Sequence, residues 1–436
     1  MLIQTSRYFL IAAVAGLLCL PAFVQAQDAA KGPQCKDQQE CDLYNSILQD
    51  NNPKTKLEKL QQWEKANPDT QFAQVRRTLL ITTYAANGQA AQAVAVAKQS
   101  LAADPKDFNA NYYVMFLTPA LYGAKQDASV LADGESAAKT LIAGIDTPPA
   151  GVAADQWAKV RPDVEVLAHS RLGFIAMQRK NWDGAEAEFK RALQLNPNNS
   201  EVDYSLGFTL LSKKDYSNGL FYYARAASYD GPGSLAAQAR QGVQTEVQRT
   251  YQAYHGKADG FTELLASAKS APNPPEGFHI ESKGEIAKKG AEEELKKQEE
   301  FAKANPQLAL WKNIKDQLNG SDGANYFNTG MKDAKLPTLR GKVVKLEPEI
   351  RPKTLILALE DGTTGDATLK FEMPLAGKVD PGTELTFEGV PESYTTSPFM
   401  VVFNVEKEDL HGWTGKNAAA PAKKAPAPAK KAPPKQ

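Results

Sequence analysis

The chain repeats itself with a constant period of 34 residues in its middle third. Residues 166–199 align without a gap over residues 200–233, so that large residues match large ones and small residues match small ones. Trp182 falls over Tyr216, and Phe189 falls over Tyr223. Such a period is the signature of a stacked repeat array, because a single repeat buries its apolar face only against its neighbours.

Each repeat has the pattern of two antiparallel helices. In the first copy Leu172 and Ile175 share one helical face, residues 181–184 form a turn, and a second apolar stripe recurs at helical spacing. Pro197 ends the second helix, because proline cannot continue it. The residues that we expect to pack the repeats together are Leu172, Gly173, Trp182, Ala185, Phe189, Ala192, Pro197, Leu206, Gly207, Tyr216, Tyr223 and Ala226.

This pattern resembles the tetratricopeptide repeat (TPR). The first copy has the residues that the motif expects from Leu172 to Pro197, whereas in the second copy Gly219 replaces an alanine and Gly231-Pro232 replaces the closing proline. A further copy extends from Leu80 to Pro105. The motif is specific for a fold and says little about function, so it favours a binding scaffold and leaves the partner open.

The resemblance implies a curved array whose concave face is lined by the first helix of each pair. Members of the family hold an extended peptide or a partner helix there, and those that grip a terminal carboxylate use lysine and asparagine. This chain has Phe174 and Phe208 instead, which favours an apolar groove. The alternative is that adjacent helices bury both rings. The matching groove positions are Leu167, Ser170, Phe174, Met177, Gln178, Glu201, Tyr204, Phe208 and Leu211.

The first 26 residues have the pattern of a cleaved signal peptide. Arg7 precedes the apolar run 8–20, and Val24-Gln25-Ala26 offers small residues at a cleavage site. We therefore expect a mature chain that starts at Gln27 and a periplasmic or secreted protein. A retained membrane anchor is the alternative, although the run is short for a membrane span.

Two cysteines, Cys35 and Cys41, follow in the N-terminal segment 27–55. In an exported chain such a pair is normally a disulfide. Metal binding is the alternative, but it needs further ligands, and the four histidines are scattered without ligand spacing. We expect no metal and no cofactor.

The helical repeats are expected over 56–280, with one helix, from Phe108, interrupted around Pro119. Residues 281–337 follow as a charged helix and a linker, the linker being the glycine- and asparagine-rich stretch 319–335. From Thr338 the apolar period becomes alternating, which predicts five short strands and a small all-β domain over 338–410, closed or sandwich-like. The predicted fold class is thus α+β multidomain: an α-helical TPR solenoid followed by a small all-β domain.

Within the β domain, Val344 and Leu346 are expected to share the buried face of the first strand, and Met373 is expected to alternate with Phe371. Asp366 and its neighbours are interpreted as strand surface. The domain weakly resembles an oligonucleotide/oligosaccharide-binding barrel. Nucleic acid is not expected as a partner, because acids outnumber bases and the aromatics fall on core-facing positions.

The end of the chain, 411–436, includes a low-complexity stretch of alanine, proline and lysine. Six lysines and no acid lie from Lys416 onward, so the rest of the chain has 45 basic and 51 acidic residues. A tail of this composition does not fold by itself. It is suited to contact an anionic polymer or a membrane surface, and the alternative is a solubilising tail.

No catalytic motif is found in the sequence. It lacks a nucleophile elbow, a phosphate-binding loop and a zinc-protease motif. We therefore expect a non-catalytic scaffold whose partner is another envelope or secreted protein. The alternative is a carbohydrate- or envelope-polymer-binding protein that uses the β domain and the lysine tail.

Overall fold

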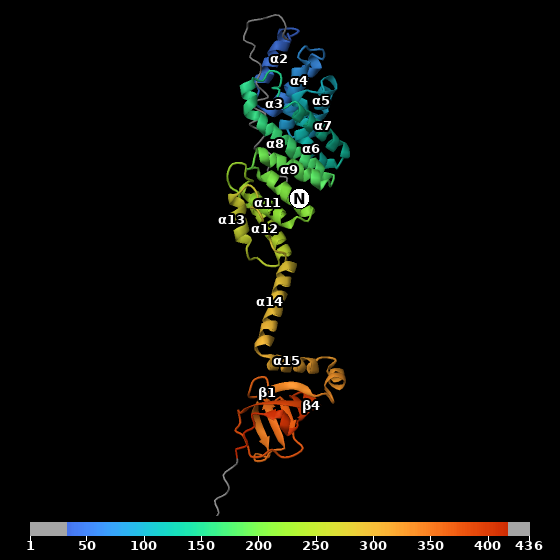
Figure 1. Ribbon diagram of the computed structural model, residues 1–436. Helices are drawn as coiled ribbons and strands as arrows, with labels where there is room; N and C mark the ends of the chain where they lie inside the picture. The colour runs from blue at the N-terminus through green and yellow to red at the C-terminus, as the bar shows by residue number, and fades with distance from the viewer. Residues whose placement is uncertain (1–32, 417–436) are drawn as a thin grey trace, which may run out of the picture. The chain divides into compact units, whose positions relative to one another are not determined.

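The structure is a computed structural model that describes residues 33–416. The chain divides into two compact units, of which the first ends at Ile286 and the second begins at Ala287. The expected signal peptide and the tail from residue 417 lie outside the described residues. The predicted fold class is confirmed, because a helical solenoid is followed by a β domain (Figure 1).

The first unit is a succession of helices in which each helix as far as α12 packs on the next along the chain, and α13 packs on α11 (Figure 1). Its helices are α2 (Gln38–Gln49), α3 (Pro53–Ala66), α4 (Ala73–Ala86), α5 (Ala90–Ala103), α6 (Phe108–Lys125), α7 (Ala128–Ala143), α8 (Ala154–Gln178), α9 (Trp182–Leu195), α10 (Ser200–Ser212), α11 (Tyr216–Ser228), α12 (Ala237–His255) and α13 (Phe261–Ser270).

The turns inside the hairpins repeat in detail. Gly88, Lys180 and Lys214 occupy the same repeat position and have φ of 72°, 59° and 67°. In the two central repeats the following residue caps the second helix: the side chains of Asn181 and Asp215 accept hydrogen bonds from Gly184 N and Asn218 N. A left-handed residue followed by an N-cap reverses the chain within a few residues, which sets the two helices antiparallel.

Close helix contact within a hairpin depends on small residues. A Cβ added at Gly173 of α8 would lie 2.7 Å from the ring of Phe189 in α9. Phe189 and Tyr223 are 2% and 1% exposed, so these rings fill the space beside the glycines. Of the residues expected to pack the repeats, the structure buries Leu172, Gly173, Ala185, Phe189, Ala192, Leu206, Gly207, Tyr223 and Ala226, half-buries Trp182, and leaves Pro197 and Tyr216 exposed.

The array starts earlier than expected. α2 packs on α3 through Ile47, Leu60 and Trp63, all fully buried, so residues 38–49 are part of the helical unit. Cys35 and Cys41 form the expected disulfide at the start of α2. The boundary at residue 56 therefore cuts through the first hairpin.

The expected interruption at Pro119 is wrong, since α6 continues through this residue to Lys125. Proline removes one backbone hydrogen bond. Neighbouring helices pack around α6 and bury most of its residues from Ala110 to Thr118, and this burial outweighs the loss.

Between the array and the strands lies α14 (Lys283–Ala304), which has no buried residue and is a solvated, charged helix as expected. The expected linker at 319–335 is wrong. After the helix α15 (Pro306–Asn319), this stretch instead forms α16 (Gly323–Tyr326) and the π-helix η1 (Phe327–Met331). Phe327 and Met331 belong to the same core as the strands, so burial of a few apolar residues outweighs the loop-like composition around them.

The strands are β1 (Leu336–Glu347), β2 (Thr354–Ala358), β3 (Ala367–Lys370), β4 (Glu384–Thr396), β5 (Phe399–Asn404) and β6 (Leu410–His411). The order β1-β2-β3-β5-β4 closes into a barrel, because β4 also pairs with β1. β3 and β5 are parallel and the other pairs are antiparallel. This arrangement resembles the five-stranded oligonucleotide/oligosaccharide-binding barrel.

Two strands of the barrel, β1 and β3, differ from expectation, and so does the position of one carboxyl group. The register of β1 shifts between Val343 and Lys345, so Val343 and Leu346 are buried where Val344 was expected. β3 ends at Lys370, and Met373 is 73% exposed because the alternation of the strand does not reach it.

The third difference is Asp366, which is not at the strand surface but is 5% exposed. It accepts hydrogen bonds from Trp311 Nε1 of α15 at 2.8 Å and from Leu359 N at 2.7 Å. Burial raises the pKa of this carboxyl, and the hydrogen bonds it accepts act in the opposite direction. Asp366 therefore links α15 to the barrel.

Candidate functional site

The first helices of the two central repeats, α8 and α10, carry the expected groove residues. Phe208 is 43% exposed, and Glu201 is also exposed. Ser170 is buried, and its hydroxyl donates to the carbonyl of Val166 at 2.7 Å, so it is not part of the accessible surface. The remaining positions are half-buried: Leu167, Phe174, Met177, Gln178, Tyr204 and Leu211.

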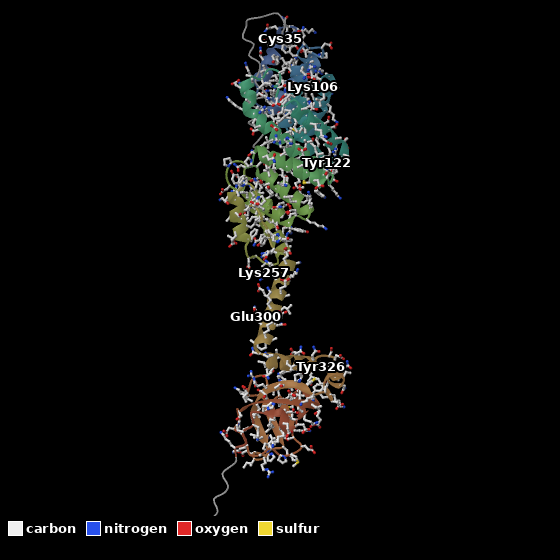
Figure 2. The ribbon with its side chains drawn as sticks, in the orientation of Figure 1. Cys35, Lys106, Tyr122, Lys257, Glu300 and Tyr326 are labelled. Atoms are coloured by element: carbon white, nitrogen blue, oxygen red, sulfur yellow. A yellow bond between two sulfur atoms is a disulfide. The ribbon has the colours of Figure 1, made fainter. Side chains whose placement is uncertain are left out.

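Phe174 and Phe208 belong to a larger set of rings that we call the aromatic row. At three successive junctions between hairpins, one ring of each hairpin contacts a ring of the next. The ring centroids are 6.4 Å apart for Tyr122 and Phe174, 6.2 Å for Trp182 and Phe208, and 4.6 Å for Tyr216 and Tyr254. Figure 2 labels Tyr122, at the start of the row in α6.

The aromatic row contains the exposed large apolar side chains of the described part of the array. These are Phe208 and Tyr216, at 43% and 37% exposure. A run of partly exposed rings is unusual on a solvated surface and is typical of a contact site, because rings offer large apolar area at a small cost in conformational entropy.

One lysine beside the row is paired with two carboxylates of the array. Lys213, which follows α10, contacts Asp183 Oδ1 at 2.5 Å and Glu186 Oε2 at 2.6 Å. The hydrogen bonds to Asp183 and Glu186 hold the pKa of Lys213 above its usual range. Lys213 is thus held by its two acidic partners and is not a free positive charge beside the rings.

Tyr204 shows how one predicted groove residue is held. Its ring stacks on Tyr223 with centroids 4.9 Å apart, and its hydroxyl lies 3.5 Å from Glu246 Oε2 of α12. Burial raises the pKa of Tyr204. Tyr204 therefore joins α10 to α12, and only one side of its ring is open to a partner.

Sequence reasoning missed Tyr122 and Tyr254 of the row. The 34-residue period did not point to them, because α6 and α12, the helices that carry these two tyrosines, lie outside the two aligned repeats 166–199 and 200–233. It also missed a buried aspartate and arginine that lie side by side in α10 and α11. Asp203 of α10 is fully buried, and Arg225 of α11 is 2% exposed. Arg225 Nε lies 3.4 Å from Asp203 Oδ2.

Arg225 connects three parts of the array. Its guanidinium donates to the carbonyls of Ala268 and Ala271 at the end of α13, and to the Pro197 carbonyl and Asn198 Oδ1 in the turn after α9, at 2.8–3.1 Å. The carboxyl of Asp203 has no hydrogen-bond partner, and its burial raises its pKa to about 8. Arg225 is thus a structural clamp between α11, the end of α13 and the turn after α9, and Asp203 of α10 lies buried against it.

A cavity of about 370 Å³ lies between α12, α13 and residues 278–281. His255 Nδ1 is 2.7 Å from the carbonyl of Glu281, and His279 Nε2 is 3.1 Å from Glu285 Oε1. No group of three or more potential metal ligands is found among residues 33–416. Over the same residues, no helix combines the length and the apolar character that a membrane crossing requires.

The first unit is therefore a helical-repeat module with a row of aromatic side chains. Comparison with known proteins identifies one of its repeats: residues 166–199 match the family model for the tetratricopeptide repeat. Repeats of this kind indicate a scaffold for interactions between proteins.

The similar proteins include one curated relative and one solved structure that illustrate how much of the chain is matched. The anaphase-promoting complex subunit 3 of Schizosaccharomyces pombe (strain 972 / ATCC 24843) is 37% identical over 65 residues, which are 15% of this chain and 10% of the relative. The chain thus matches about a tenth of that relative's length. The crystal structure of a thermophilic TPR protein in Thermus thermophilus is 18% identical, covers 49% of this chain and 95% of its own, and has a TM-score of 0.30.

Proposed function

We propose that the array is a non-catalytic scaffold that binds a segment of another protein on the aromatic row. The observation that carries this proposal is the exposure of Phe208 and Tyr216 beside the half-buried Trp182 and Tyr254. The accessible apolar area of these rings favours an apolar segment. The partner contributes a hydrophobic strand or the apolar face of an amphipathic helix.

The proposed location is the periplasm or the outside of the cell. It is supported by the signal-peptide pattern of residues 1–26 and by the disulfide between Cys35 and Cys41, because disulfides persist in oxidising compartments. The partner is accordingly an envelope or secreted protein.

The test is affinity capture from an envelope extract, followed by measurement of Kd with the purified partner. The bait is the chain from Gln27, beside the same chain with Phe208→Glu and Tyr216→Glu. Both residues are exposed, so the change places charge on the row without entering the core. The matched control is Phe301→Glu, because Phe301 on α14 is 38% exposed and lies outside the array.

A partner retained by the original bait and by the control, and lost by the double variant, supports the proposal. Circular dichroism checks that all three baits are folded. A second double variant, Phe174→Glu with Phe208→Glu, tests the two phenylalanines that the repeat motif places in the groove. If the double variant with Tyr216→Glu retains the same protein at an unchanged Kd, the aromatic row is not the site.

The alternative function is binding of a carbohydrate or envelope polymer by the β domain and the lysine tail. Its support is the closed barrel, a fold that binds oligosaccharides in other proteins. A chain without residues 27–280 keeps this activity if the alternative holds, and a chain without residues 338–410 loses it.

A further inference from the structure

The turns of the two central repeats each place a lysine two residues before a ring of the aromatic row. Lys180 precedes Trp182, and Lys214 precedes Tyr216. Because two residues of chain span about 7 Å at most, each lysine starts close to its ring. Both lysines are exposed, and they lie in the turns and not at the groove positions of α8 and α10. The aromatic row therefore has a basic residue beside it in both repeats.

The backbone of both lysines has the left-handed conformation. Their φ angles are 59° and 67°, a region in which a side chain costs free energy that glycine avoids. The turn between α4 and α5 has Gly88 at this position, with φ of 72°, and Ala90 in place of the ring. Lysine thus occurs together with the ring, and glycine occurs without it. Strain that is kept at an exposed position points to a role other than packing.

Lys180 and Lys214 differ from the other charged side chains around these two turns, which are bound within the array. The bound side chains are Arg179 with Glu135, Lys213 with Asp183 and Glu186, and Asp215, which caps α11. Within residues 33–416, no carboxylate lies at ion-pair distance from Lys180 or Lys214. Each turn therefore keeps one positive charge that is available to a partner.

We propose that the protein segment bound on the aromatic row is acidic as well as apolar. Its carboxylates pair with Lys180 and Lys214, while its apolar side chains contact Phe208 and Tyr216. This inference rests on the proposed function of the row and specifies the chemistry of the partner. Complementary charges at the edge of an apolar contact raise the association rate and disfavour partners of the wrong sign.

A single-stranded nucleic acid also combines negative charge with flat apolar groups, but the geometry of the row disfavours it. Bases bind by stacking on free ring faces. Tyr216 stacks on Tyr254 with centroids 4.6 Å apart, which covers one face of each ring. The side chain of Asp183 beside the row is 89% exposed and would repel a continuous phosphate backbone. The carboxylates of a protein segment can instead be spaced to match two separate lysines.

The experiment measures binding of labelled synthetic peptides to the chain from Gln27 by fluorescence polarisation. One set of peptides has leucines at helical spacing, and the other has leucines at every second position. Within each set the remaining positions alternate serine with glutamate, glutamine or lysine. The glutamate peptide of one set is expected to bind about tenfold more tightly than its glutamine counterpart at low salt, because two exposed ion pairs form, and the lysine peptide is expected to bind most weakly. High salt is expected to reduce the difference.

The double variant Lys180→Asn with Lys214→Asn removes both charges and keeps the turns, because asparagine tolerates positive φ. It is expected to bind the glutamate peptide about tenfold more weakly and the glutamine peptide as before. The matched control is Lys65→Gln with Lys106→Gln, two exposed lysines near the turns that join successive hairpins; Figure 2 labels Lys106. The control is expected to bind both peptides like the original chain. Lysines elsewhere are common to all these chains, so they cancel in the comparison.

The inference fails if neither set of peptides binds, or if the asparagine variant binds the glutamate peptide as tightly as the original chain. Equal binding of glutamate and glutamine peptides that is lost with Phe208→Glu and Tyr216→Glu would also overturn it, but would leave the proposed function standing. Oligothymidylate that binds more tightly than the glutamate peptide, and through the same two lysines, would make the row a nucleic-acid site. Capture from the envelope extract tests the proposed function itself, so the two proposals can fail separately.

Discussion

Replacement of Asp203 tests whether the buried carboxyl beside Arg225 is protonated in the folded array. Its carboxyl is fully buried and accepts no hydrogen bond, and Arg225 Nε lies 3.4 Å away while the guanidinium is bonded to four other oxygens. Burial outweighs the attraction of Arg225 and raises the pKa of Asp203 from 3.8 to about 8. The folded array therefore holds a proton that the unfolded chain releases.

The sign of the pH dependence follows from this difference in bound protons. A raised pKa in the folded state contributes stability that is complete below pH 3.8 and is lost as pH rises towards about 8. In that window unfolding releases one proton at this site, so stability falls by about 1.4 kcal/mol per pH unit. From pH 5 to pH 7 the loss from Asp203 is about 3 kcal/mol.

The perturbation is Asp203→Asn, which keeps the shape of the side chain and cannot titrate. We expect the free energy of unfolding of the variant, relative to the original chain, to increase by about 3 kcal/mol between pH 5 and pH 7. The assay is urea unfolding of the array followed by far-ultraviolet circular dichroism at several pH values. Other titrating groups are common to both chains and cancel in the difference.

Asp155→Asn is the matched control, because it removes one carboxylate from the exposed first turn of α8. It measures the effect of losing a surface charge. If the difference between Asp203→Asn and the original chain stays constant from pH 5 to pH 7, the carboxyl is ionised in the folded array. The attraction of Arg225 would then outweigh the burial, and the reasoning above would be refuted.

Three further changes test the fold that supports the site. Arg225→Met is expected to lower the free energy of unfolding by about 3–5 kcal/mol, because four hydrogen bonds between α11, α13 and the turn after α9 are lost. Urea unfolding measures this loss, and a change below about 1 kcal/mol would contradict the prediction. Lys180→Gly with Lys214→Gly is expected to raise the unfolding free energy by about 1 kcal/mol for each residue, because both have positive φ; a lower melting temperature would argue against this. Trp311→Phe is expected to destabilise the barrel unit by about 1–3 kcal/mol, because Asp366 loses a buried donor, and faster amide exchange in residues 359–367 is the readout.

The helical array was predictable from sequence because its large and small residues recur every 34 positions. The alignment of Trp182 with Tyr216, and of Phe189 with Tyr223, predicts that these residues have equivalent positions in successive repeats, even when the helices that they contact are unknown. The same pattern located the turn at Asn181, where the structure has an N-cap. Closure of the β domain could be anticipated from alternation and turn residues, but the bulge after Val343 and the early end of β3 depend on long-range pairing.

The residues that the sequence did not reveal are those whose role depends on distant parts of the chain. Phe327 and Met331 lie in a stretch rich in glycine and asparagine, and only the barrel gives them a core to enter. From the sequence, Asp366 is a polar residue near a strand. The side chain that donates a hydrogen bond to it in the core belongs to Trp311, which is distant in the sequence. Local composition cannot encode either contact, because the sequence separations are large.

The aromatic row shows the same limit at the candidate site. The motif placed Phe174 and Phe208 at equivalent repeat positions, yet the structure exposes Phe208 at 43% and half-buries Phe174. Each ring contacts one other ring in a T-shaped arrangement, Tyr122 for Phe174 and Trp182 for Phe208, so the difference in exposure does not come from these ring contacts alone. Binding energy on the row should therefore concentrate around Phe208 and Tyr216, where apolar area is still accessible, and decline towards Phe174.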